Sequence, residues 1–191
     1  MLLPGYGATA PNLVAASHRR TVRTRLRGDQ GVRAGLVRRD LDRLAGLMAG
    51  ARSMERDIGR RVAGHPLLGM PGVGPIVAAT ILGRLGDPGR VRTHGALAML
   101  AGVAPIPASS GQVRRVRLNR GGDRELNRAF YVIALTQVRV HPPARAYFER
   151  KRAEGKSGPE AMRSLKRHLV RAVFHLTRPV SPVLADGRGH I

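Results

Sequence analysis

The sequence predicts a mainly α-helical protein, in which a long amphipathic helix precedes a compact helical domain with one short β-hairpin. Three observations support this fold class. Apolar residues recur at three- and four-residue steps over several long stretches, clusters of glycine and proline separate these stretches, and only one short segment alternates between apolar and polar residues. With 191 residues, 42% of them hydrophobic, the chain is large enough to bury a core.

The first sixty-four residues divide into two predicted segments. Residues 1–32 mix Gly, Pro, Thr and Arg without a sustained period, so we expect a flexible basic arm. Residues 33–64 are expected to form one amphipathic helix, as a coiled coil that self-associates or as a helical hairpin; an ordinary helix packed on its own domain is an equal alternative. The apolar positions that share its face are Val37, Leu41, Leu44, Met48, Ala51, Ile58 and Val62.

A compact domain is expected over residues 65–178. Its start is His65-Pro66, since a residue that precedes proline avoids the α region. The stretch "HPLLGMPGVGPIVAATILGRLGD" predicts a short helix, a glycine turn and a second helix, and "RTHGALAMLAGVAP" predicts another helix. The alternating "VRRVRL" predicts a short strand or hairpin that "NRGGD" closes, and two amphipathic helices follow around Phe130 and Leu169. Residues 179–191 are expected to be a disordered tail.

The charge of the chain indicates a polyanionic partner. There are 34 Lys and Arg residues against 12 Asp and Glu residues, a net charge of +22. The cations are 31 arginines and 3 lysines, a skew that a GC-rich coding sequence also produces, but such a skew does not explain the shortage of acids. Because there are only 3 Tyr, 3 Phe and no Trp, base stacking is a minor contribution, and we expect nucleic acid to be bound through its phosphates.

Cysteine and long apolar runs are both missing from the sequence. We therefore expect no disulfides, no cysteine metal sites and no membrane-spanning helix. We expect a cytoplasmic, nucleoid-associated protein that makes no contact with a membrane.

The glycine turn "MPGVGPIVAAT" is the first candidate nucleic-acid site. Gly72 and Gly74 flank Val73 directly before a helix that begins at Pro75, a residue favoured at the first helical position. Glycine allows a close approach of the backbone, and free N–H groups at a helix start attract phosphate. The pattern resembles the helix-hairpin-helix motif, which binds a backbone phosphate without reading sequence. The alternative is a tight turn that requires glycine only for its dihedral angles.

Two adjacent serines, Ser109 and Ser110, form the second candidate site because arginines are concentrated beside them. Residues 112–152 contain 11 Lys and Arg residues against 3 Asp and Glu residues, a charge of +8. Serine alone is a weak nucleophile, and fixed positive charge at the phosphate supplies only part of what phosphoryl transfer requires. The arginines expected to bind phosphates bidentately are Arg114, Arg115, Arg117, Arg120, Arg124 and Arg128.

The acidic residues predict no metal site. A two-metal centre requires several converging carboxylates, and the 12 acids of this chain form no convincing cluster. Asp40 and Asp42 lie two apart on a predicted helix and point in different directions. Asp123 and Glu125 lie at a predicted helix start, where carboxylates stabilise the helix dipole. We expect both pairs to be structural and no cofactor to be bound by this chain.

The order of these features resembles the C-terminal half of the insertion-sequence one-ten family of transposases, over about residues 35–178. Its most specific segments are "PGVG", "AGVAP" followed by a Ser-Gly pair, and "GGDRELNR". The resemblance implies a DNA recombinase that acts with a guide RNA. It also implies that Ser110, directly before Gly111, is the nucleophile that attacks a DNA phosphodiester. The family's N-terminal RNase-H-like domain, whose four acidic residues bind Mg²⁺, has no counterpart here, so we expect a truncated copy that is inactive alone.

Two other functions stay open at this point. One is a non-catalytic nucleic-acid-binding remnant that contacts phosphates at element ends or on a guide RNA. The other is a basic RNA-binding structural protein, which would explain the charge but not the glycine turn or the Ser-Gly pair. The partner that all three share is nucleic acid, DNA in the leading interpretation.

Overall fold

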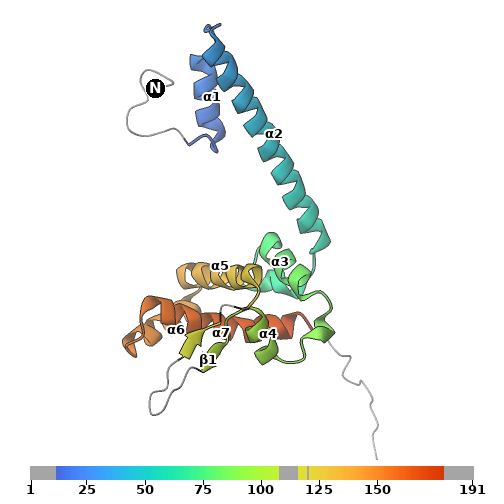
Figure 1. Cartoon of the computed structure of the whole chain (residues 1–191), viewed down its shortest axis with the longest axis vertical. Coiled ribbons are helices and arrows are strands. Elements are labelled where there is room, and N and C mark those ends of the chain that lie inside the picture. Colours follow the sequence, from blue (N-terminus) through green and yellow to red (C-terminus); the bar gives the residue numbers. More distant parts are fainter. Residues whose placement is uncertain (1–11, 108–115, 120, 179–191) are drawn as a thin grey trace, which may run out of the picture. The chain divides into compact units, whose positions relative to one another are not determined.

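The computed structural model describes residues 12–107, 116–119 and 121–178. The protein is mainly α-helical, as the sequence predicts, and its contacts form two compact units, residues 1–57 and 58–191. Each unit is described by itself. Figure 1 shows the elements in sequence colours. The predicted compact domain over residues 65–178 and the predicted tail over residues 179–191 stay predictions.

The first unit contains the helix α1 (Ala16–Arg25) and most of the long helix α2 (Val32–Arg61). Its small core consists of Val22 and Leu26 on one side and Ala34 and Leu41 of α2 on the other. The prediction of a flexible arm over residues 1–32 is therefore wrong for residues 16–25. These residues become helical because Val22 and Leu26 are buried against α2, although their own sequence is almost entirely polar.

The second unit surrounds one larger hydrophobic core. Figure 1 shows α5 above the α6 and α7 pair, with α3 beside α5 and α4 beside α7. Phe130 and Ile133 of α5 are fully buried in this core, as are Leu67 and Ile81. The elements of the unit that follow α2 are η1 (Pro66–Gly69), α3 (Pro75–Leu85), η2 (Pro88–Arg90), α4 (His94–Leu100), β1 (Pro105–Pro107), β2 (Val116–Leu118), α5 (Arg124–Val140), α6 (Pro142–Ala153) and α7 (Gly158–Leu176).

Three helices of this unit, α4, α5 and α7, begin at residues whose side chains cap them. Thr93 accepts a hydrogen bond from the N–H of Ala96 at 3.1 Å, and Asp123 accepts one from the N–H of Leu126 at 2.9 Å. Ser157 and Glu160 form a capping box at the start of α7. Asp123 is thus structural, as the sequence predicts. The helix α6 was not predicted, because only Ala144 of its residues is buried and its apolar period is weak.

The structure contains the predicted short β-hairpin as an antiparallel pair of three-residue strands, of which only Val116–Leu118 lies in "VRRVRL". The prediction that "NRGGD" closes the hairpin is wrong, because Pro105–Pro107 supplies the second strand and residues 119–123 connect β2 to α5. Pro105 of β1 pairs with Leu118 of β2, and Pro107 pairs with Val116. Residues 108–115, which connect the strands, lie outside the described residues. Across the parts of the chain that the structure describes, no helix combines the length and the apolar character needed to cross a membrane.

Candidate nucleic-acid interface

The glycine turn between η1 and α3 packs directly on α5. Gly72 has a φ of +83°, and a Cβ there would lie 3.1 Å from the carbonyl oxygen of Ile133 and 3.2 Å from Cβ of Thr136. A side chain at this position would therefore meet both backbone strain and a packed neighbour. Val73 is buried, so the turn exposes no side chain at its centre.

A buried glutamine holds this turn in place. Gln137 of α5 is 5% exposed, and its Nε2 donates a hydrogen bond of 2.7 Å to the carbonyl oxygen of Pro71. The N–H of Val73 donates to the carbonyl of Met70 at 3.0 Å. The turn is thus fixed by α5 as well as by its own backbone.

The start of α3 is open on its outer side. Gly74 occupies the N-cap position, where no side chain accepts a hydrogen bond, and a Cβ added there would meet nothing within 4 Å. Pro75 follows at the first helical position and has no N–H to offer. The N–H groups of Ile76 and Val77 have no intrahelical acceptor at such a position, and the positive end of the helix dipole lies there. Helix starts of this kind attract anions such as phosphate.

A second tight junction joins α4 to the start of α5. Gly102, with a φ of +63°, lies against Gly122, and the N–H of Asp123 donates to the carbonyl of Leu100 at 2.6 Å. Asn127 donates from Nδ2 to the carbonyl oxygens of Ala101 and Gly102 at 2.8 and 3.1 Å. This junction fixes the base of the β-hairpin.

The structure separates the predicted site residues into two groups. Arg124 and Arg128 are both exposed at the start of α5. Gly72 contacts Ile133, nine residues along α5 from Arg124, which corresponds to about 13 Å of helix. The structure therefore does not bring Arg124 to the glycine turn.

The side chains of the remaining predicted residues are not described by the structure. Arg117 lies in β2, where only its backbone is described. Ser109, Ser110, Arg114, Arg115 and Arg120 lie outside the described residues.

The carboxylate of Asp123, which lies near these sites, is already engaged. Asp123 caps α5 and lies 3.4 Å from Nε of Arg84, measured from its Oδ2. Within residues 12–107, 116–119 and 121–178, no three or more His, Asp or Glu side chains are grouped so that they could hold a metal ion. The contacts of Asp123 therefore serve helix capping.

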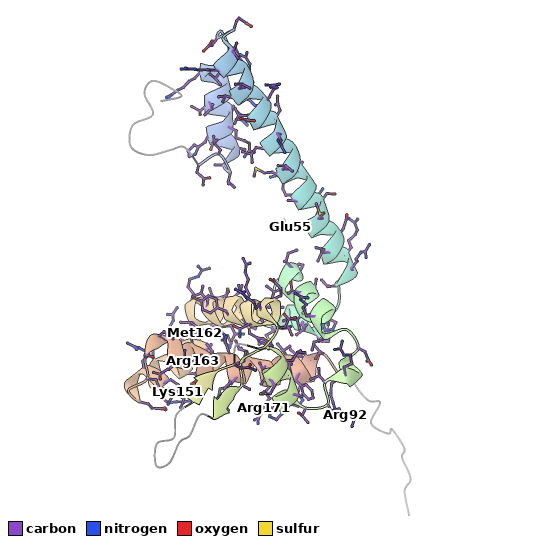
Figure 2. All side chains as sticks on the ribbon, viewed as in Figure 1. Glu55, Arg92, Lys151, Met162, Arg163 and Arg171 are labelled. Atoms are coloured by element: carbon purple, nitrogen blue, oxygen red, sulfur yellow. The ribbon has the colours of Figure 1, made fainter. Side chains whose placement is uncertain are left out.

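A basic surface on α6 and α7 was not predicted from the sequence. Lys151, Arg163 and Arg171, which Figure 2 labels, belong to this surface. The available signal was the four-residue spacing of Arg163, Arg167 and Arg171, which places them along one helix face. Because α6 was not predicted, the contribution of its Lys151 to this surface was not predicted either.

Comparison with known proteins gives a consistent family. The family model described as "Transposase IS116/IS110/IS902 family" matches residues 64–149. The "Insertion element IS110 uncharacterized 43.6 kDa protein" of Streptomyces coelicolor is 36% identical over 132 residues, which cover 66% of this chain and 33% of that protein. The "Insertion element IS900 uncharacterized 42 kDa protein" of Mycobacterium paratuberculosis is 37% identical over 114 residues, which cover 59% of this chain and 29% of that protein.

A third relative agrees with these two. The "Insertion element IS116 uncharacterized 44.8 kDa protein" of Streptomyces clavuligerus is 35% identical over 111 residues, 57% of this chain and 28% of that protein. The chain thus spans about a third of the length of the curated relatives that it matches. The segment matched by the family model contains the glycine turn, the Gly102–Gly122 junction and all of α5, and this match together with the three relatives supports an IS110-family transposase.

Proposed function

We propose that this chain binds nucleic acid through backbone phosphates and takes part in the transposition of an insertion element. The observation that carries the proposal is the open N-terminus of α3, which Gln137 and Gly72 fix against α5. Oriented N–H groups on a fixed turn bind phosphate without reading bases, as in a helix-hairpin-helix. DNA is the leading partner, since the relatives are proteins of insertion elements, and a guide RNA is the second.

Salt dependence tests this part of the proposal. The affinity for a 30-base-pair duplex should fall steeply between low and moderate salt, with a log-log slope of several units, because each bound phosphate releases counterions. The measurement is fluorescence anisotropy with labelled duplexes of two unrelated sequences. A flat salt dependence, or binding to only one of the two sequences, would contradict a phosphate-based interface.

Ser110 is proposed to be the nucleophile. Its Oγ would attack the phosphorus of a DNA phosphodiester, so that an Oγ–P bond forms, one P–O bond to a deoxyribose breaks, the hydroxyl proton leaves Oγ and the departing oxygen takes up a proton. Ser110 lies three residues after Pro107 in the sequence.

Magnesium would stabilise the charge that develops on the phosphate. The described residues of this chain do not form a site that fits the ion.

A covalent adduct is the test for Ser110. The chain is mixed with supercoiled DNA, magnesium, the RNase-H-like domain of a full-length relative and that relative's guide RNA. Protein–DNA adducts should form with the native chain and with Ser109→Ala, and should disappear with Ser110→Ala. Adducts that survive Ser110→Ala would exclude this serine, and the absence of adducts together with strong, salt-dependent binding would favour the second candidate function, a non-catalytic binding module. The structural engagement of Asp123 is the observation that favours this alternative.

Self-association through α2 is the remaining part of the proposal. Leu47 and Met54 are 65% and 63% exposed and lie seven residues apart, the spacing of one heptad. We expect a concentration-dependent dimer in analytical ultracentrifugation, which Leu47→Glu with Met54→Glu should convert to a monomer. The matched control is Arg43→Glu with Arg52→Glu, which changes exposed polar positions of the same helix.

A further inference from the structure

The second unit contains a cleft between α4 and β1 on one side and α6 and α7 on the other. It consists of two hollows of about 490 and 280 Å³ that share Pro105, Ser164 and Arg167 in their walls and therefore adjoin. We call this the basic cleft, after the six cations that line it: Lys151, Lys156, Arg163, Lys166, Arg167 and Arg171.

Two carboxylates, Glu154 and Glu160, lie near the six cations of the basic cleft, and each already has hydrogen-bond partners. Glu160 lines the cleft, but its Oε2 accepts hydrogen bonds from the hydroxyl and the N–H of Ser157 at 2.6 and 2.8 Å. Glu154 lies 2.8 Å from Nζ of Lys151 and 3.2 Å from Nζ of Lys156. No described carboxylate lies within 4 Å of the guanidinium nitrogens of Arg163, Arg167 or Arg171, although the charge of Glu160 interacts with that of Arg163.

Lys166 is a buried cation without a carboxylate partner among the described residues. It is 8% exposed, and its Nζ donates one hydrogen bond of 2.9 Å to Oδ1 of Asn127, a neutral amide. Burial, and secondarily the charge of Arg163, lower the pKa of Lys166. A buried ammonium is costly unless an anion compensates it, and an ammonium has three N–H groups to donate. The cleft therefore favours an anionic ligand beside Lys166.

The lysines of the chain are confined to this cleft. The sequence contains 31 arginines and 3 lysines, and the three lysines, Lys151, Lys156 and Lys166, all line the basic cleft. A coding bias towards arginine acts on the whole chain, so it does not explain why every exception lies at one place. Lysine differs from arginine in presenting a compact charge with donors that rotate, which suits phosphate oxygens.

The length of the cleft favours a strand over a small anion. Arg163, Arg167 and Arg171 lie at four-residue steps on α7, so their Cα atoms span about 12 Å along the helix axis. One strand of duplex DNA carries a phosphate every ~3.4 Å along its axis, so several phosphates fall within that span. A single phosphate contacts only part of the row.

We propose that the basic cleft binds the phosphodiester backbone of a nucleic-acid strand, as a second contact separate from the glycine turn. This inference depends on the proposed function in one respect, that the chain binds nucleic acid. The fixed Lys166 and the arginine row supply charge along the strand.

Amine footprinting of the native chain tests the inference. The protein is treated with an N-hydroxysuccinimide ester of biotin, alone, with a 30-base-pair DNA duplex, with a hairpin RNA, or with inorganic phosphate at the same phosphate concentration. Biotinylation of Lys156, whose side chain is 40% exposed, should fall several-fold with either nucleic acid and should be unchanged by inorganic phosphate. Equal protection by inorganic phosphate would overturn the proposal, because the cleft would then be a small-anion site.

Matched charge variants provide the second measurement. Lys156→Gln, Arg163→Gln and Arg167→Gln together should lower the log-log salt slope by about 2.7, the loss of three phosphate contacts on duplex DNA. The control combines Arg43→Gln, Arg52→Gln and Arg56→Gln, which remove the same charge from exposed positions of α2 and should change the slope by less than about one. Circular dichroism verifies that both variants are folded.

The outcomes separate the two proposals. Binding by the native chain without protection of Lys156, or an equal change of slope in the two triple variants, overturns the basic cleft and leaves the proposed function standing. Failure of the native chain to bind DNA or RNA overturns both.

Discussion

Gly102 and Gly122 lie backbone against backbone, so close that a Cβ on Gly122 would overlap the nitrogen and the Cα of Gly102 and would lie 3.0 Å from the carbonyl carbon of Ala101. The two glycines belong to the segments "AGVAP" and "NRGGD". Their contact closes the base of the β-hairpin and places Asn127, the partner of Lys166, over the same backbone. The requirement for glycine in both segments is thus steric.

Gly122→Ala should destabilise the second unit by at least about 3 kcal/mol, because backbone atoms must separate to admit the methyl group. Urea unfolding followed by circular dichroism measures the free energy of unfolding. The control is Gly83→Ala in α3, where a Cβ meets nothing within 4 Å, and where alanine should stabilise the helix by about 0.5–1 kcal/mol. A loss below about 1 kcal/mol in Gly122→Ala would show that the junction yields easily.

Gly74→Asp should change stability and binding in opposite directions. Aspartate is a favourable N-cap, so α3 should gain up to about 0.5 kcal/mol over glycine. The same carboxylate occupies the space proposed for a phosphate and repels it, so duplex affinity at low salt should fall at least fivefold. Gly74→Asn, an N-cap without charge, should retain the affinity in fluorescence anisotropy. An equal loss of affinity in both variants would indicate bulk at this position and not charge.

Gln137→Met should loosen the glycine turn. The substitution keeps the volume of the side chain but removes the donor to the carbonyl oxygen of Pro71, which should cost about 1 kcal/mol of stability. Hydrogen exchange of the Val73 amide, which donates to Met70, should accelerate more than exchange in α7. The neighbouring exposed change Leu135→Met serves as control and should leave both values unchanged. Unaltered exchange at Val73 would show that the backbone alone fixes the turn.

The start of α7 should weaken in acid. The hydroxyl and then the N–H of Ser157 donate to Glu160 and lower the pKa of this carboxyl below its usual value of 4.5. The unfolded chain therefore binds more protons than the folded chain between the lowered pKa and pH 4.5. The stabilisation from Glu160 is complete above pH 4.5 and is lost as the pH falls through the lowered pKa.

Urea unfolding between pH 3 and pH 6 checks this expectation. Glu160→Gln should remove that component of the pH dependence. Ser157→Ala should reduce it, because the hydroxyl donor is gone while the N–H remains. A pH dependence identical in all three proteins would mean that the capping box does not contribute.

Much of the fold could be predicted from the sequence, because the helices that build the main core carry their own signal. In α5, Leu126, Phe130 and Ile133 recur at helical spacing and are all buried. In α1 only Val22 is buried among ten residues, so its helical state depends on packing against α2, which no local pattern reveals. The helix α6 was also not predicted, because it begins at two consecutive prolines, Pro142 and Pro143.

The glycine turn was predictable in position but not in mechanism. The sequence indicates that Gly72 and Gly74 shape a turn, whereas their different roles, Gly72 packed on α5 and Gly74 open at the helix end, depend on a contact with residues more than sixty positions away. The basic cleft was not predicted for the same reason. Lys156 and Lys166 line one cleft only because α6, α7 and β1 lie together in the folded chain.

The confinement of lysine to the basic cleft also determines where acyl chemistry can act. Acyl donors react with amines and leave guanidinium groups intact, and no side-chain amine of this chain lies elsewhere. Lys151 and Lys156 are partly exposed, with 22% and 40% of their side chains accessible. Acetylation of these lysines removes positive charge from the cleft while every arginine of the protein keeps its own.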